Sequence, residues 1–187
     1  MRLFTAIEFP EHVRAHLARV ADALRPIPAL RENVSWTKPD TYHVTLKFLG
    51  DVDDARVPLL VASLRTLPIP MMTFTVDRFL VLPGQGPARV LAANVTRDLK
   101  PIVSLFHQIE SACQPLGVSR EGRDFKPHVT FGRIRRPTRR LTAATLIRLV
   151  DPGLLPGPTF AAASFTLFQS RLEPTGAVHT PVATFTA

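Results

Sequence analysis

The chain has 187 residues, which is enough for one sizeable hydrophobic core but too few for two large independent domains. Its hydrophobic fraction of 45% is typical of a globular protein, and no apolar run approaches the roughly 20 residues that a membrane-crossing helix needs. Lys and Arg number 23 against 15 Asp and Glu, a net charge of +8 that favours polyanionic partners, while a single cysteine excludes an internal disulfide and a cysteine-based zinc site.

The N-terminal segment has one basic residue and a short apolar stretch that is broken by Glu8 and Pro10. A secretory signal needs a longer apolar region followed by a small-residue cleavage site. We therefore expect a cytoplasmic protein, a single domain over residues 1–187 and, by default, a monomer.

The first half of the chain predicts alternating strands and helices. Leu3 to Phe9 is apolar-rich and extended, and Pro10-Glu11 then opens a helix whose apolar residues recur at helical spacing up to Leu24. Extended character returns at Val34. The further elements expected in this half are a strand over 42–49 and a helix over 54–66.

The second half predicts two hairpins and a long helix. Residues 72–82 and 89–95 should pair around a turn at 83–87, and the longest helix should cover 99–116. A strand over 125–134 and a helix over 141–150 follow, and strands over 160–170 and 178–185 should close the chain as a hairpin around Pro174-Thr175-Gly176. Because hairpin-length turns join several strands, we predict an α+β fold rather than a doubly wound parallel sheet.

A short motif occurs twice. Tyr42-His43-Val44-Thr45-Leu46 and Pro127-His128-Val129-Thr130-Phe131 share His, Val and Thr, and their histidines lie 85 positions apart, close to half the chain. Each copy sits in a strand-like segment that follows a strand and a helix. This spacing is expected of two duplicated lobes rather than of a short-period solenoid.

The motif places two kinds of side chain on one face of each strand. Because side chains at i and i+2 of a strand point to the same side, His43 and Thr45 should face one cleft, as should His128 and Thr130. One neutral imidazole can accept a proton from water while one imidazolium donates a proton to a leaving oxygen, and the threonine hydroxyls can donate to phosphate oxygens. The four residues therefore predict catalysis at phosphorus without a metal or another cofactor.

The number of His-x-Thr triplets is weak evidence by itself, because about 0.6 of them would arise by chance in a chain with six His and 18 Thr. The alternative is a pair of hydrogen-bonded core histidines. Identical central valines, apolar surroundings and the half-length spacing favour the functional interpretation. His12 and His16 are also spaced to share a metal on the first helix, but no third ligand is evident and a solvated helix face is the simpler interpretation.

On these residues the chain resembles the 2H phosphoesterase superfamily, and within it the bacterial and archaeal RNA 2′,3′-cyclic phosphodiesterases related to 2′-5′ RNA ligases. The resemblance spans nearly the whole chain and rests on four segments. These are the opening Met1-Arg2-Leu3-Phe4-x-Ala6-Ile7, then Trp36 with 43–50, then Lys126-Pro127-His128-Val129-Thr130-x-Gly132-Arg133, and the closing 167–170 with Leu172, Pro174 and Gly176. One departure is His179, which stands where the closing segment often carries tyrosine.

The resemblance implies a bilobed, pseudo-twofold fold in which two intertwined lobes, each an antiparallel sheet backed by helices, face a central groove. It also implies hydrolysis of RNA or nucleotide 2′,3′-cyclic phosphates to 2′-phosphomonoesters. By the same resemblance His43 would be the acid that protonates the leaving 3′ oxygen, and His128 would be the base that activates water.

Further residues near the motifs are candidates for substrate binding. Phe48 and Phe125 could stack on a base, although both are at least as plausible as core residues. Lys126 and Arg133 flank the second motif inside a stretch, 119–140, that holds eight basic and two acidic residues, and Arg133 is the better candidate for a phosphate contact. Two alternatives stay open: a 2′-5′ RNA ligase acting at the same site, and a non-catalytic module that binds RNA ends.

Overall fold

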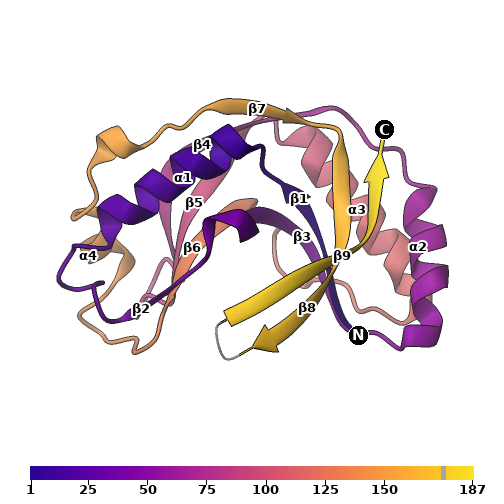
Figure 1. Ribbon diagram of the computed structural model, residues 1–187, viewed down its shortest axis with the longest axis horizontal. Coiled ribbons are helices and arrows are strands. Elements are labelled where there is room, and N and C mark those ends of the chain that lie inside the picture. The colour runs from indigo at the N-terminus through magenta and orange to yellow at the C-terminus, as the bar shows by residue number, and fades with distance from the viewer. Residues whose placement is uncertain (174–175) are drawn as a thin grey trace.

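The computed structural model describes residues 1–173 and 176–187, which form two antiparallel sheets with helices packed against them (Figure 1). The α+β prediction is confirmed. The four-stranded sheet has the order β3-β1-β8-β9, with β1 (Arg2–Glu8), β3 (His43–Asp51), β8 (Ser164–Glu173) and β9 (Gly176–Thr186). The five-stranded sheet has the order β2-β6-β5-β4-β7, with β2 (Val34–Trp36), β4 (Met72–Leu82), β5 (Val90–Arg97), β6 (His128–Ile134) and β7 (Thr159–Ala162).

Four α-helices and four short 3₁₀ helices connect the described strands. The α-helices are α1 (Glu11–Leu24), α2 (Val57–Arg65), α3 (Lys100–Cys113) and α4 (Ala143–Ile147); the 3₁₀ helices are η1 (Pro39–Thr41), η2 (Asp54–Arg56), η3 (Gln114–Leu116) and η4 (Pro152–Leu154). The predicted helix over 99–116 therefore consists of α3 and η3. It stops at Gly117, whose φ of 81° lies in the left-handed region that glycine adopts without a Cβ clash.

Most predicted strands are present, with two corrections. The segment predicted over 125–134 becomes a strand only at His128, because Pro127 has no N–H to donate to a ladder. The segment predicted over 160–170 is two strands in different sheets: β7 pairs with β4, the chain turns at Ala163, and β8 pairs with β1 and β9. Pro174 and Thr175, where the last turn was predicted, lie outside the described residues.

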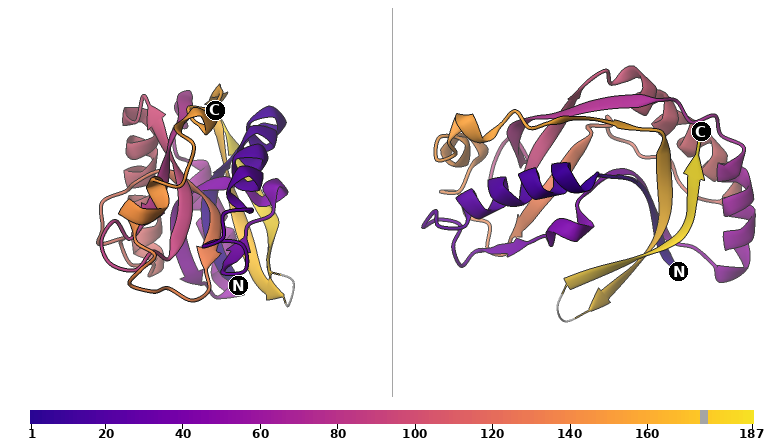
Figure 2. Two further views of the ribbon diagram at one scale, coloured as in Figure 1. Left: turned by 90° about the vertical axis from the view of Figure 1, so that its left-hand side faces the viewer. Right: turned by 45° about the horizontal axis from the view of Figure 1, so that its top comes forward.

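The two 14-residue helices cover opposite sheets. Phe9, just before α1, packs edge-on against Phe160 of β7, and α1 lies over the five-stranded sheet (Figures 1 and 2). Helix α3 lies against β3 of the four-stranded sheet, where Glu110 pairs with Lys47. Each helix thus covers a sheet whose strands come mainly from elsewhere in the chain. A single large hydrophobic cluster joins both sheets and both helices.

Strands β3 and β6 repeat each other residue by residue. Both alternate between half-buried and buried side chains up to Leu46 and Phe131, and each of these two residues is an extra, bulged residue relative to its partner strand. After the bulge the alternation changes phase, so that Lys47 is buried whereas Phe48 is 63% exposed. The same bulge in β6 returns the exposed Arg133 to the side of the strand that carries His128 and Thr130.

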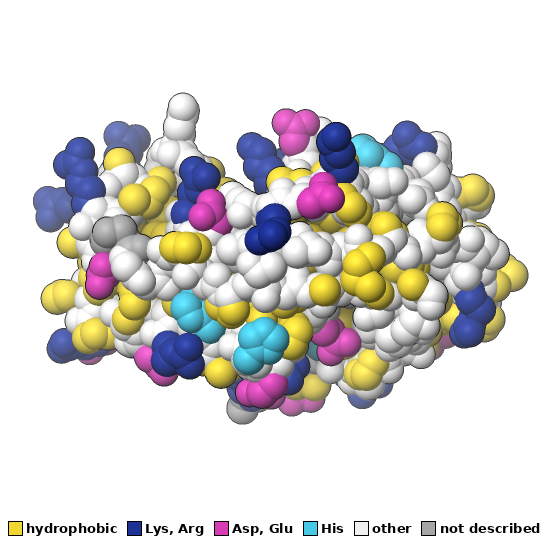
Figure 3. Space-filling view, turned by 90° about the horizontal axis from the view of Figure 1, so that it is seen from above, with side chains coloured by type: hydrophobic (Ala, Val, Ile, Leu, Met, Phe, Trp, Pro, Cys, Tyr) yellow, Lys and Arg dark blue, Asp and Glu magenta, His cyan; other side chains and the backbone are white. Residues whose placement is uncertain are grey.

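No helix among the described residues is both long and apolar enough to cross a membrane. The face shown in Figure 3 carries Lys and Arg side chains interspersed with Asp and Glu, and a group of basic side chains gathers at one end of it. The excess positive charge is therefore unevenly spread over this face.

Candidate functional site

A groove of about 630 Å³ lies between the two sheets and is lined by both copies of the motif. His43 and Thr45 reach it from β3, and His128 and Thr130 reach it from β6. Both strands therefore show the expected alternation of side chains, since Val44 and Val129, which lie between the motif residues, are fully buried. Two pairs of groups that are far apart in the sequence therefore line one space.

Both motif imidazoles are anchored in the same way. Nδ1 of His43 lies 2.7 Å from the carbonyl oxygen of Thr41, and Nδ1 of His128 lies 2.7 Å from the carbonyl oxygen of Lys126. A carbonyl oxygen can only accept, so in each ring Nδ1 carries the hydrogen and donates it. When either ring is neutral, the lone pair that can take up a proton is therefore on Nε2.

The two rings differ in their surroundings. Burial lowers the pKa of His43 to about 4, an effect that the hydrogen bond to the Thr41 carbonyl opposes and that the neighbouring His179 and His128 rings reinforce. Nε2 of His43 also lies 3.1 Å from Oγ1 of Thr45. In the ligand-free protein His43 is therefore neutral near pH 7, with its basic nitrogen in contact with a hydroxyl.

The charged side chains that line the groove are cationic. Arg2, Lys38 and Arg133 contribute to its wall, and no Asp or Glu does so among the residues that the structure describes. Fixed positive charge around a partly enclosed space attracts anions. The groove is therefore suited to a ligand with a phosphate group, and Arg133 lies where its sequence position suggested.

A cluster of aromatic rings lines part of the groove. Phe4 of β1 lies at the centre of this cluster, with ring centroids 5.9 Å from Phe48, 5.3 Å from Phe168 and 4.9 Å from His179. Phe48 lines the groove and is largely exposed, so its ring is available to a ligand. This is the geometry in which a nucleobase can stack on an aromatic side chain.

Two of the candidate binding residues lie elsewhere. The ring of Phe125 stacks on Phe106 of α3, with centroids 4.5 Å apart and an interplanar angle of 6°, beside a separate pocket. The Lys126 side chain is exposed and does not line the groove, although its carbonyl oxygen orients His128. Both residues precede the start of β6, so the alternation of that strand does not direct them toward the groove.

Sequence reasoning missed several groove residues. Arg2, Phe4 and Lys38 lie outside both copies of the His-x-Thr motif. They reach the groove because their segments lie beside the motif strands. His179 was noticed only as a departure from a resembling pattern, yet its ring lies 5.5 Å from that of His43. Among the described residues, no group of three His, Cys, Asp or Glu side chains could hold a metal ion.

Comparisons with known proteins give a consistent result. A family model described as "LigT like Phosphoesterase" matches residues 7–92 and 96–179. The RNA 2′,3′-cyclic phosphodiesterase of Methanocaldococcus jannaschii is 26% identical over 183 residues, covering 96% of each chain. The protein of the same description from Thermus thermophilus is 29% identical over 192 residues, covering 99% of this chain and 89% of the relative. The one from Escherichia coli is 25% identical over 188 residues, covering 97% of this chain and 93% of the relative.

Solved structures share the fold. A crystal structure of a Thermus thermophilus protein superimposes with a TM-score of 0.81 at 25% identity and covers 100% of this chain and 97% of that one. Escherichia coli LigT complexed with 3′-AMP gives a TM-score of 0.79 at 24% identity, with coverage of 99% and 97%. These proteins therefore share the two-sheet fold of this chain.

Proposed function

The chain belongs to the LigT-like phosphoesterase family, and from this membership and the groove described above we propose that it hydrolyses 2′,3′-cyclic phosphate ends of RNA or nucleotides. The relatives that bear the name RNA 2′,3′-cyclic phosphodiesterase match almost the full length of the chain. We infer that the product is the 2′-phosphomonoester.

The observation that carries the proposal is the pair of anchored imidazoles. His43 and His128 enter one cationic groove from two different sheets, and each has its Nδ1 hydrogen held by a carbonyl two residues earlier. Nε2 is therefore the nitrogen of each ring that can transfer a proton, and in His43 it also contacts the Thr45 hydroxyl. A general acid and a general base on opposite sides of one phosphoryl group are what in-line displacement by water requires.

The proposed reaction balances one proton accepted against one donated. A neutral imidazole takes a proton from water as the water oxygen attacks phosphorus, and the bond between phosphorus and the 3′ oxygen breaks. An imidazolium gives a proton to that 3′ oxygen. The Thr45 and Thr130 hydroxyls and the Arg133 guanidinium donate to the non-bridging oxygens, where negative charge develops. The two rings end with exchanged protonation states and are reset by solvent.

We infer that His43 is the acid and His128 the base. Burial keeps His43 neutral in the ligand-free groove, so its proton has to be stabilised by the substrate. The cyclic phosphate carries one negative charge, and an opposite charge a few ångströms away raises the pKa of an imidazole. Substrate binding thus favours the imidazolium form of His43 that donation requires.

The test is to incubate the protein with a nucleoside 2′,3′-cyclic phosphate in EDTA and to identify the phosphomonoester. Turnover in EDTA is expected, and His43→Ala or His128→Ala should lower the rate roughly 10²- to 10⁴-fold, since each removes one proton transfer. His12→Ala is the matched control, because His12 is exposed on α1 outside the groove. Turnover only after addition of a metal ion, or full activity in both motif variants, would refute the proposal.

A further inference from the structure

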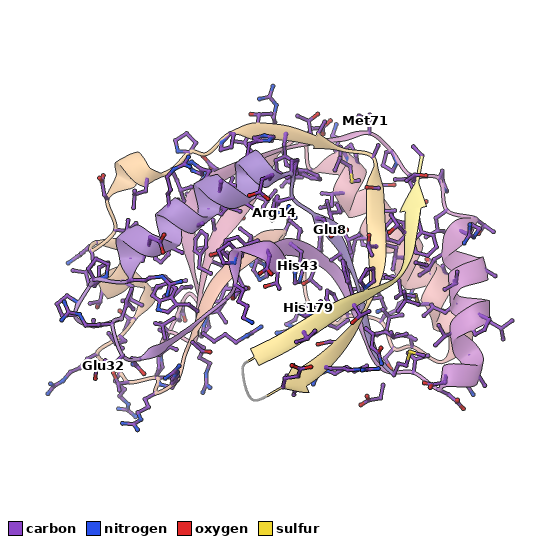
Figure 4. The ribbon with its side chains drawn as sticks, in the orientation of Figure 1. Glu8, Arg14, Glu32, His43, Met71 and His179 are labelled. Atoms are coloured by element: carbon purple, nitrogen blue, oxygen red, sulfur yellow. The ribbon has the colours of Figure 1, made fainter. Side chains whose placement is uncertain are left out.

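His179 is a third imidazole in the groove and belongs to neither motif. It comes from β9, the last strand of the four-stranded sheet, and lies beside His43 in Figure 4. Its ring packs edge-on against Phe4, with centroids 4.9 Å apart, and against His43, with centroids 5.5 Å apart. A side chain contributed by the β8–β9 hairpin thus reaches the ring that we infer to be the acid.

The hydrogen bonding of His179 differs from that of the motif histidines. Its Nδ1 is buried and has no hydrogen-bond partner among the described residues. Buried acceptors without a partner are tolerated more often than buried donors without one. The neutral tautomer that fits this environment carries its hydrogen on Nε2 and leaves an unpaired acceptor at Nδ1.

The surroundings of His179 keep the ring neutral. Burial lowers its pKa, and protonation would place a charged N–H at Nδ1 with no acceptor. The titratable and charged groups that share the groove are His43 from β3, His128 from β6, Arg2 from β1, Lys38 and Arg133. None of these described groups is acidic, so none would stabilise an imidazolium at position 179.

We propose that His179 is a catalytic residue that stays neutral and donates its Nε2 hydrogen to a non-bridging oxygen of the bound phosphoryl group. The proposal rests on the function proposed above and adds a third role to the groove. His43 and His128 would transfer protons, whereas His179 would only stabilise negative charge. The phosphoryl charge acts on both rings, but protonated His43 has an acceptor for its Nδ1 hydrogen and His179 has none among the described residues. The added proton therefore goes to His43, and His179 stays neutral.

The experiment compares His179→Phe, which keeps an aromatic ring against Phe4 but has no donor, with His179→Gln, which keeps an N–H donor. Loss of one hydrogen bond to a charged group should lower kcat/KM roughly 10- to 100-fold in His179→Phe. In His179→Gln the decrease in log(kcat/KM) should be no more than half of the decrease in His179→Phe. The pH profile should have the same shape in all three proteins, because no proton transfer is removed.

Two results would overturn the proposal. Wild-type kcat/KM in His179→Phe would show that the ring does not contact the substrate. Loss of one limb of the pH profile in both variants, with no recovery in His179→Gln, would show that His179 transfers a proton. If wild-type protein does not turn over cyclic nucleotides, the proposed function fails first. Titration with inorganic phosphate then tests His179 by itself, with weaker binding expected in His179→Phe and equal binding as the refuting outcome.

Discussion

Protonation of His43 should cost the folded protein stability, and the cost can be worked out from its environment. The pKa of the ring is about 4 in the folded protein, against 6.5 for an unperturbed histidine. Between these two values the unfolded chain binds a proton that the folded protein does not bind. Stability is therefore fully present above about pH 6.5 and falls as the pH is lowered toward 4. At pH 5 the loss amounts to about 2 kcal/mol.

Urea unfolding at a series of pH values between about 7.5 and 4.5 measures this loss, with His43→Gln as the matched control. The glutamine variant should match the pH dependence of all other groups and lack the contribution of His43. The difference in unfolding free energy between wild type and variant should therefore change by about 2 kcal/mol from pH 7 to pH 5. Parallel curves for the two proteins would refute the claim that burial suppresses protonation of His43.

The same ring should respond to an anionic ligand. Titration of its Cε1 proton by NMR should give a pKa of about 4 without ligand and a clearly higher pKa with a bound 2′-mononucleotide, because the phosphate charge favours the imidazolium. A pKa that stays at about 4 in the complex would contradict the acid role. His43 would then be the better candidate for the base, and His128 for the acid.

Three further substitutions test other parts of the structure. Lys47→Met should lower the unfolding free energy, measured by urea unfolding, by about 3 to 5 kcal/mol, because it leaves the buried carboxylate of Glu110 without its cation. The double variant with Glu110→Leu should recover most of this loss. A double variant as unstable as Lys47→Met would contradict the reasoning. Gly132→Ala should lower the unfolding free energy by about 1 to 3 kcal/mol, since the added Cβ would lie 2.5 Å from Cγ1 of Val34. Adding Val34→Ala should restore part of this loss. A wild-type Tm for Gly132→Ala would refute the close approach. Arg133→Ala should reduce the slope of log affinity for single-stranded RNA against log salt by about 0.7, and an unchanged slope would show that Arg133 makes no phosphate contact.

The strands and the convergence of the motifs could be predicted because both depend on local periodicity. His43 and Thr45 share a face for the same reason that Val44 is buried, and the same rule applies in the second copy of the motif. The apolar stripe that predicted α1 is also the stripe that is buried, including Val13 and Leu17. Where one periodic rule decides the structure over a whole strand or helix, the sequence was sufficient.

Features that depend on contacts between distant segments could not be predicted. A bulge at Leu46 changes the phase of β3, so that Lys47 is buried and Phe48 lines the groove, and no local signal marks the extra residue. Phe125 resembles a groove residue in sequence but precedes the strand and stacks on α3. His179 reaches the groove only because the last hairpin pairs with the edge of β1 that β3 leaves open.

The crossed placement of α1 and α3 has a consequence for the history of the chain. A fragment that ended before β5 would lack α3, which lies against β3, and would lack three of the five strands in the sheet that α1 covers. Such a fragment could complete its layers by associating with a second copy of itself, each subunit lending the other a helix and a histidine. Fusion of two genes would then convert this symmetric dimer into one polypeptide and leave the two active-site halves free to diverge.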